Sequence, residues 1–459
     1  MSFQASISPG RARSARATVV AFALCAVGGY AADCFSAGTP FAWCPPIQVA
    51  RGPAEQGPWR QNESKYDYVD DATVALHATG SAAVAWVDQA RKDVLFQVFE
   101  RDGRPRFAQA VNVSRTPQVF SWLPRIALGA GRPHEVYILW QEIVFSGGSH
   151  GGDMFFARSR DGGASFETPV NLSQSSGGDG KGRINREFWH NGSFDLAMAP
   201  DGALYAAWTE YEGALWFTRS LDGGTRFSTP TQIVSGTPHP ARAPALAVGA
   251  GSRVYLAWTV GQDAAADIRL ARSADRGGIF GTPTTVSRTS GYSDAPKLAV
   301  DSKGTVHLVH AESAGGPFGK YHIRYTRSHD HGRTFERARD LSSRFRPAVA
   351  SAAFPGLSVD SADRLFVLWE LYSDPRHRPV GLALAFSDDG GHSFSSPERV
   401  PHSTGPHGAV NGSLQGLLMR KLAVAGEGTI AVVNSAFKAN AVSHVSLIRG
   451  FLLAGNSHC

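Results

Sequence analysis

SLDGGTRF, residues 220–227, recurs with small changes at four other places in the chain. The four copies are SRDGGASF (159–166), SADRGGIF (273–280), SHDHGRTF (328–335) and SDDGGHSF (387–394). All five fit the pattern Ser-x-Asp-x-Gly-x-x-Phe. A sixth stretch, ERDGRPRF (100–107), keeps Asp102 and Phe107 but loses the Ser and shifts the Gly. The six octets start 53 to 61 residues apart, so the chain is built from repeated units.

Each octet occupies the same place in a series of short strands. Upstream stands an apolar triplet, which occurs seven times, at residues 74, 126, 196, 246, 298, 357 and 422. A strand that usually ends in Trp follows, such as VYLAW (254–258), then a third strand that leads into the octet, and a fourth after it. Units of four short strands cannot bury their own faces and must stack on one another. The pattern therefore predicts an all-β fold, a β-propeller of four-stranded blades.

The number of triplets favours seven blades, although the seventh unit is incomplete. It starts at Leu422 and has neither an octet nor a fourth strand. PPIQVA (45–50) is similar to fourth strands such as TPTTVS (282–287). We therefore expect the N-terminal strand to complete the last blade and close the ring. The alternative is a six-bladed, sialidase-type ring in which the last segment forms closing strands.

The octet resembles the Asp box of the sialidase-superfamily (BNR-repeat) propellers, and the resemblance covers about residues 65–455. It implies a propeller fold and places each octet in the turn between the third and fourth strands. We interpret the five octet aspartates as structural, because a catalytic site is needed once and these turns lie far apart around a ring. They would accept hydrogen bonds from turn amides. They are Asp161, Asp222, Asp275, Asp330 and Asp389.

Residues 1–32 are typical of a secretory signal peptide. Arg11, Arg13 and Arg16 precede an apolar run (17–29), and small residues stand before Asp33. A membrane anchor is the alternative, but the run is short for a membrane span. We expect a signal peptide at 1–32, an N-terminal segment with the closing strand at 33–64, and the propeller at 65–459. The mature protein would be secreted or periplasmic, with no membrane span.

Composition narrows the possible partners. The formal net charge is +6, and the three signal arginines account for half of it. Because no basic stripe with interleaved aromatic residues is present, nucleic acid is not expected as a partner. Cys34, Cys44 and Cys459 remain after signal cleavage, and an oxidising compartment favours a bridge whose pairing stays open. No CxxC or His/Cys cluster is present, so we expect no metal and no cofactor.

The face opposite the octets is where we expect a site, because the loops after the second strands and between blades meet there. Arginine beside aromatic side chains suits a hydroxylated or anionic ligand such as a glycan. The candidate catalytic residues are Glu210, Tyr211, Glu370 and Tyr372. The candidate ligand-binding residues are Arg186, Glu187, Trp189, His190, Asn191, Arg288, Tyr292, Asp294, Arg344, Arg346, Glu142 and Glu312.

Three functions from different classes fit these residues. The first is recognition of an extracellular glycan or glycoconjugate. The second is a sialidase-type exo-glycoside hydrolase, for which the resemblance implies three arginines on the substrate carboxylate, a Tyr–Glu nucleophile pair and an Asp acid. The family's Arg-Ile-Pro motif is missing, since Ala127 stands where Pro is expected in LPRIAL (123–128). The third is a non-catalytic protein-binding scaffold. The sequence leaves the ligand and the oligomeric state undefined.

Overall fold

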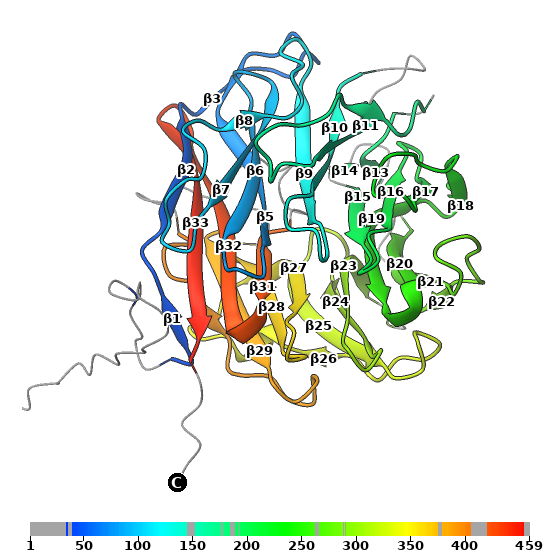
Figure 1. Ribbon diagram of the computed structural model, residues 1–459. Coiled ribbons are helices and arrows are strands. Elements are labelled where there is room, and N and C mark those ends of the chain that lie inside the picture. The colour runs from blue at the N-terminus through cyan, green and yellow to red at the C-terminus, as the bar shows by residue number, and fades with distance from the viewer. Residues whose placement is uncertain are drawn as a thin grey trace, which may run out of the picture.

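The protein is a closed ring of seven β-sheets, as the sequence predicted. The computed structural model describes residues 34, 39–144, 152–175, 178–183, 189–191, 193–261, 266–287, 289, 291–374, 379–404 and 420–453. Six sheets have four antiparallel strands, and the seventh combines strands from both ends of the chain. The first strands of neighbouring sheets contact one another in an unbroken cycle (Figure 1). This closure confirms the seven-bladed propeller and sets the six-bladed alternative aside.

Within a blade the strands run outward from the centre of the ring in sequence order. The first strands are β5 (Val69–Leu76), β9 (Ser121–Leu128), β15 (Phe194–Met198), β19 (Ala241–Gly249), β23 (Tyr292–Val300), β27 (Ser351–Val359) and β31 (Leu422–Ala425). The second strands are β6 (Ala82–Asp88), β10 (Val136–Glu142), β16 (Leu204–Thr209), β20 (Arg253–Val260), β24 (Val306–Ser313), β28 (Leu365–Tyr372) and β32 (Thr429–Lys438). The third strands are β7 (Asp93–Phe99), β11 (Asp153–Ser159), β17 (Ala214–Ser220), β21 (Asp267–Ser273), β25 (Tyr321–Ser328), β29 (Gly381–Ser387) and β33 (Val442–Leu452).

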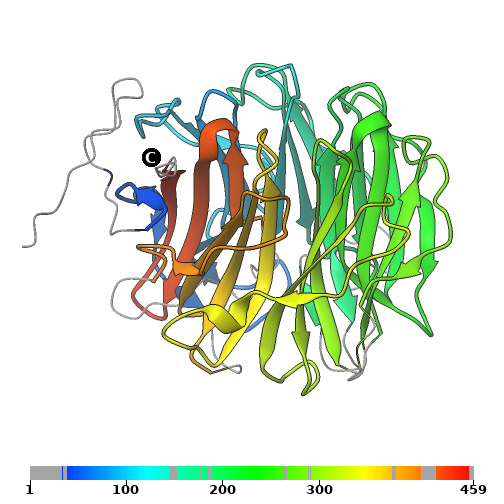
Figure 2. The same ribbon diagram turned by 90° about the horizontal axis from the view of Figure 1, so that it is seen from below.

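The fourth strands are short and peripheral. They are β8 (Val111–Asn112), β12 (Val170–Asn171), β18 (Thr231–Ser235), β22 (Thr284–Thr285), β26 (Arg339–Asp340) and β30 (Glu398–Arg399). Two small hairpins stand outside the blades: β3 (Glu55–Gln56) with β4 (Tyr66–Asp67), and β13 (Lys181–Arg183) with β14 (Trp189–Asn191). The helical turns that the structure describes are 3-10 turns at Ala250–Ser252, Ser342–Arg344 and Gly426–Gly428. Figure 2 shows the blades from another side, with their strands spanning the thickness of the ring.

The N-terminal segment completes blade 7, which confirms the predicted closure. β1 (Phe41–Trp43) and β2 (Ile47–Gly52) both pair antiparallel with β33, with Phe41 opposite Leu452 and Gly52 opposite Ser443. In Figure 1 the blue β1 and β2 lie beside the red β33. A disulfide joins Cys34, which precedes β1, to Cys44, which lies between β1 and β2. It settles the pairing that the sequence left open, while Cys459 lies outside the described residues.

Each octet is the turn between the third and fourth strands, and its Ser and Asp hold the backbone in place. In blade 3 the Ser220 hydroxyl donates to Asp222 and accepts from the Gly224 amide at 2.8 Å. Asp222 in turn accepts from the Arg226 amide at 2.9 Å. The same bonds recur in blades 2, 4, 5 and 6. The octet aspartates are thus occupied by their own turns.

The octet also fastens each blade to the one before it. In blades 2, 3, 4 and 6 the octet Phe ring meets a third-strand aromatic ring of the preceding blade edge-on: Phe227 lies 4.9 Å from Phe156, and Phe394 lies 4.8 Å from Tyr325. The octet Gly packs beneath that same side chain, because a Cβ on Gly224 would stand 2.8 Å from Phe156. Glycine is required twice over, since φ is also positive there.

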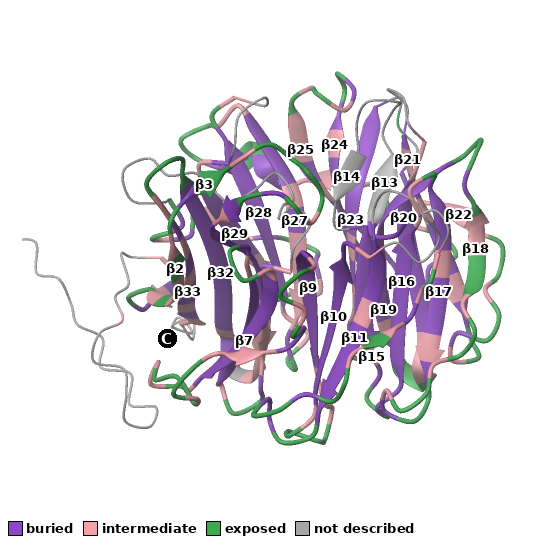
Figure 3. Ribbon diagram, turned by 90° about the horizontal axis from the view of Figure 1, so that it is seen from above, coloured by how far each residue is buried: buried purple, intermediate pink, exposed green. Residues whose placement is uncertain are grey.

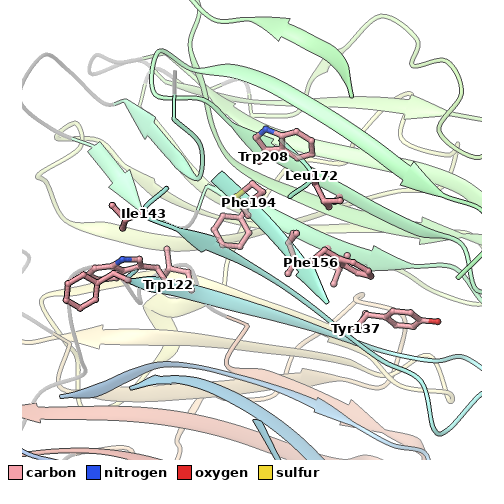
Figure 4. Packing of buried hydrophobic residues seen from close by; sticks show 14 of the residues in the cluster. Trp122, Tyr137, Ile143, Phe156, Leu172, Phe194 and Trp208 are labelled. Atoms are coloured by element: carbon pink, nitrogen blue, oxygen red, sulfur yellow. The ribbon is translucent and has the colours of Figure 1, made fainter. Parts of the chain in front are cut away.

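The core lies between blades rather than inside any one of them. Figure 3 shows burial concentrated on the inner strands and exposure on the turns and outer strands. Figure 4 shows one such layer, where Phe156 and Leu172 of blade 2 lie with Phe194 and Trp208 of blade 3. The second-strand tryptophans always contribute to the layer shared with the preceding blade. Stacking therefore supplies the burial that a single sheet lacks.

Two adjacent glycines in one octet allow the cost of backbone strain to be measured apart from the cost of a packing clash. Gly390 and Gly391 both have positive φ, at 66° and 82°. A Cβ on Gly390 would meet nothing within 4 Å, whereas one on Gly391 would overlap the Tyr325 phenol. We expect Gly390→Ala to lower the free energy of unfolding by about 1 kcal/mol, and Gly391→Ala by about 3 kcal/mol. Denaturant unfolding of both variants measures the difference, and equal losses would contradict the proposed interblade contact.

Candidate functional site

The direction of the strands defines two faces around a central channel. Third strands end at the octets, so first strands end on that same face, the octet face, and begin on the opposite one, the upper face. The channel contains a cavity of about 420 Å³ lined by first strands of all seven blades. Its wall is apolar along the triplets, as at Leu246, Leu298 and Leu422. The charged side chains that line the cavity are at its upper end.

Charged side chains gather at this upper end, in the residue that precedes each triplet. Four of the seven first strands carry a charge there: Arg125, Asp195, Lys297 and Lys421. Arg420 adds a fifth, and its Nη2 reaches across the ring from blade 7 to the Asp195 carboxylate of blade 3 at 2.9 Å. Arg125 Nε lies 3.9 Å from the same carboxylate. Asp195, Lys297, Arg420 and Lys421 all line the cavity.

Electrostatics make this end of the channel positive. Burial opposes ionisation of Asp195, but Arg420, Lys297 and Arg125 hold its pKa below the ordinary value. Burial lowers the pKa of Lys297 to about 8, and Arg125 and Arg420 act in the same direction. Burial and the neighbouring Asp70 raise the pKa of Asp71 well above its usual range. Three cations thus share one firmly ionised carboxylate.

A repeated β-bulge shapes the upper end of the first strands. In five blades the pairing register shifts at a non-glycine residue with positive φ, between 49° and 58°. These residues are Asp71, Leu123, Ala243, Ala295 and Phe354. Bulges redirect the side chains that follow them, and proline is tolerated there because the ladder is already broken. Arg125 and Lys297 each follow a proline in the bulge, so the bulge sets the direction of their side chains.

Two of the candidate catalytic residues lie together beside this cluster. Tyr372 Oη donates to Glu370 Oε2 at 2.7 Å, and Lys421 Nζ contacts Glu370 Oε1. Both residues are on β28, two positions apart, so they share the side of the strand that faces blade 7. Burial, followed by the charge of Glu370, raises the pKa of Tyr372 well above its ordinary value. The pair is buried, with Tyr372 only 5% exposed.

Tyr292 and Asp294 also come together, in a buried contact between blades 4 and 5. Arg242 Nε lies 3.4 Å from Asp294 Oδ1, and its guanidinium lies 5.0 Å from the centre of the Tyr292 ring. The Thr259 hydroxyl donates to Asp294 at 3.0 Å. Because every partner is buried, this group is a brace for the upper ends of β19 and β23 rather than an open contact surface.

Glu142, Glu312 and Glu210 are held in their own blades, away from the channel. Each stands two residues after the Trp position, so it shares the side of that residue and faces the preceding blade. Glu142 accepts from Thr116 and Trp140, both at 2.9 Å. Glu312 pairs with Arg324. Burial raises the pKa of Glu210, and neighbouring Tyr211 donates its amide to Gly178.

The remaining predicted residues do not meet at the channel within the described parts. The exposed Arg344 and Arg346 donate to the backbone carbonyls of Phe394, Ser343 and Phe345. Arg186, Glu187 and Arg288 lie outside the described residues. Trp189, His190 and Asn191 form β14, whose side chains are not described, and its partner β13 packs against β19. The hairpin therefore stands next to the upper end of the channel.

Sequence reasoning missed the charged layer and one exposed aromatic group. Aligning the repeats on the residue before each triplet would have revealed the charges, because that position is charged in four of the seven units and small in the other three. Trp59 lies outside the repeats; it is 47% exposed, and its ring lies 6.1 Å from that of the buried Trp122. Trp122 is near the upper end of β9, so Trp59 is a platform on the upper face.

Comparisons with known proteins give the fold. No family model and no curated protein matches the sequence. A protein of unknown function from Dyadobacter fermentans matches in structure with a TM-score of 0.51 at 14% identity, over 76% of this chain and 99% of that one. An ulvan lyase of polysaccharide lyase family PL25, bound to -[GlcA(1-4)Rha3S]-, matches with a TM-score of 0.54 at 12% identity, over 84% and 95%.

A sialidase is also among the structural neighbours. The microbial sialidase Hz136 has a TM-score of 0.44 at 12% identity, over 80% of this chain and 73% of that one. At 14% and 12% identity, the first two likenesses show the fold alone. In the described ranges, no helix is long and apolar enough to cross a membrane. The same ranges contain no group of three or more His, Cys, Asp or Glu side chains placed to hold a metal ion.

The lowered pKa of Lys297 makes stability depend on pH. Between the folded value of about 8 and the ordinary 10.5, the unfolded chain binds more protons than the folded one. Stability should therefore rise with pH across this window, by about 3 kcal/mol. Lys297→Met should abolish the rise, whereas Lys320→Met, at an exposed lysine, should keep it. Urea unfolding from pH 7.5 to 10.5 measures this, and identical profiles for wild type and Lys297→Met would refute it.

Proposed function

We propose that this propeller is an extracytoplasmic protein that recognises an acidic glycan at the upper end of its central channel. The observation that carries the proposal is that Lys297 and Arg420 line the end of a 420 Å³ cavity and, with the fully buried Arg125, surround a single carboxylate. Buried ion pairs seldom add net stability, so a surplus of cations facing a cavity is better explained by an anionic ligand.

Trp59 supplies the second element that a saccharide site needs. An exposed indole offers an apolar face to a sugar ring, and Phe120 and Trp122 fix its position from below. The neighbouring ulvan lyase was solved with a uronate- and sulfate-bearing saccharide. That chemistry, carboxylate and sulfate groups beside hydroxyls, is what arginines with an aromatic platform would recognise.

Export is supported by two independent features. The first 32 residues have the composition of a signal peptide, and the Cys34–Cys44 disulfide suits an oxidising compartment.

A protein-binding scaffold is less favoured than glycan recognition. The exposed large apolar side chains of the described chain are scattered over successive units instead of forming one patch. They are Trp59, Val170, Leu221, Ile279 and Phe318.

Hydrolysis of sialidase type is the second candidate, favoured by the Tyr372–Glu370 hydrogen bond of 2.7 Å. Two observations weigh against a nucleophilic role. Burial and Glu370 both raise the pKa of Tyr372, which keeps the phenol protonated, and Lys421 already occupies the other Glu370 oxygen. We therefore place binding ahead of turnover and interpret the pair as a brace between blades 6 and 7.

Isothermal titration with ulvan oligosaccharides of the GlcA–Rha3S repeat tests the binding proposal. Arg420→Ala should weaken affinity at least tenfold by removing a charge-assisted contact. Trp59→Ala should weaken it about fivefold through lost stacking. Arg226→Ala is the matched control, because this exposed arginine lies in an octet on the other face. Equal affinities for all four proteins, or no binding by wild type to this or other acidic glycans, would refute the proposal.

A panel of fluorogenic glycosides, sialosides included, separates binding from catalysis. We expect no turnover by the wild-type protein. Turnover that Tyr372→Phe reduces by a factor of about 10² or more would instead establish the hydrolase. Tyr321→Phe is the control for loss of a buried phenol on the same face, because Tyr321 donates to the Pro317 carbonyl and is not bonded to Glu370.

A further inference from the structure

Blade 5 departs from the other blades at one repeat position. In blades 1, 2, 3, 4 and 6 the second strand carries a buried tryptophan that packs against the preceding blade. These are Trp86, Trp140, Trp208, Trp258 and Trp369. Blade 5 has His310 at this position, and it is equally buried, at 1% exposure. An imidazole is smaller than an indole, so the interface between blades 4 and 5 is incompletely filled.

The unfilled space is a groove of about 550 Å³, distinct from the central channel. His310, Glu312 and Arg324 form its blade 5 wall, and Thr285 and Ser287 form its blade 4 wall. This size is within the range of small-ligand sites. Hydroxyl, carboxylate, guanidinium and imidazole groups all face one space, which is the lining that sugar hydroxyls require.

His310 presents a hydrogen-bond acceptor that has no partner in the described part of the chain. Its Nδ1 lies 3.4 Å from the Ala311 carbonyl oxygen, which can only accept, so the proton resides on Nδ1. Nε2 is then an acceptor, and it is buried without a partner among the described residues. Burial lowers the pKa of His310 to about 4, so the ring stays neutral. A ligand hydroxyl would satisfy this orphaned nitrogen.

The groove is also lined by two arginines that are not neutralised by a carboxylate of the described chain. Glu312 is paired with Arg324 at 2.9 Å, and Glu336 with Arg327 at 3.0 Å. Arg333 and Arg337 line the groove, are exposed, and form no ion pair within the described chain. Two unneutralised guanidinium groups favour a ligand that carries an anionic group.

We propose that the groove between blades 4 and 5 is a second saccharide site, one that takes an acidic sugar unit. The carboxylate of the sugar lies against Arg333 and Arg337, and a hydroxyl donates to His310 Nε2. The site goes beyond the function proposed for the channel, because no residue is shared between the two. It would give the protein two contact points for one polyanionic chain, or a separate monosaccharide site.

NMR titration with D-glucuronate tests the groove, with D-glucose as the neutral counterpart. His310→Trp fills the groove with the side chain that five other blades accommodate, and Arg333→Glu reverses an exposed charge without touching the core. Each should weaken glucuronate binding at least fivefold, and glucose should bind more weakly than glucuronate to wild type. Arg226→Glu is the matched charge reversal in another octet, and Arg420→Ala removes the channel contact.

The controls keep the two sites distinguishable. Glucuronate affinity at the groove, followed by the ring resonances of His310, should be unchanged in Arg226→Glu. Arg420→Ala reports on the channel, where it should weaken the binding that shifts the resonances of channel residues. The groove site is overturned if glucuronate shifts no His310 resonance in wild type, if Arg420→Ala removes that shift, or if Arg333→Glu retains wild-type affinity at the groove. Should His310→Trp fail to fold, Arg333→Glu decides the question, because its side chain is exposed.

Discussion

The contact between each octet and the preceding blade is the interaction on which the ring depends. A Ser–Asp clasp fixes the turn, a glycine lets the backbone lie against the preceding third strand, and a phenylalanine fills the remaining gap. Repetition of this contact from blade to blade determines how the sheets stack. The last blade has no octet, and there the N-terminal strands close the ring by pairing with β33.

This arrangement gives the two faces of the ring different polar groups. The octet aspartates accept hydrogen bonds from their own turns. At Asp161, burial opposes ionisation, but these side-chain and backbone hydrogen bonds hold the pKa below its ordinary value. On the upper face the first strands bring together charged side chains that, unlike the octet aspartates, are not part of a Ser–Asp turn. Arg420 and Asp195 are 225 residues apart and meet only because the ring is closed. The site is therefore a product of closure.

The difference between what the sequence predicted and what it missed has the same origin. Octets, triplets and strand periods are local, so the propeller, the blade number and the closing strand followed from them. Tyr372 and Glu370 meet because two positions on one strand share a side. Contacts across the channel have no such local signature. Trp59 belongs to no repeat, and the substitution of His310 for tryptophan has meaning only once the blade interfaces are known.

The upper end of the channel as a recognition site for acidic glycans is the central claim, and a crystal structure with a bound GlcA–Rha3S oligosaccharide tests it most directly. We expect a sugar ring on Trp59 and an acidic group in contact with Arg420. Saccharide bound only outside the channel, with none in contact with Trp59 or Arg420, would contradict the claim.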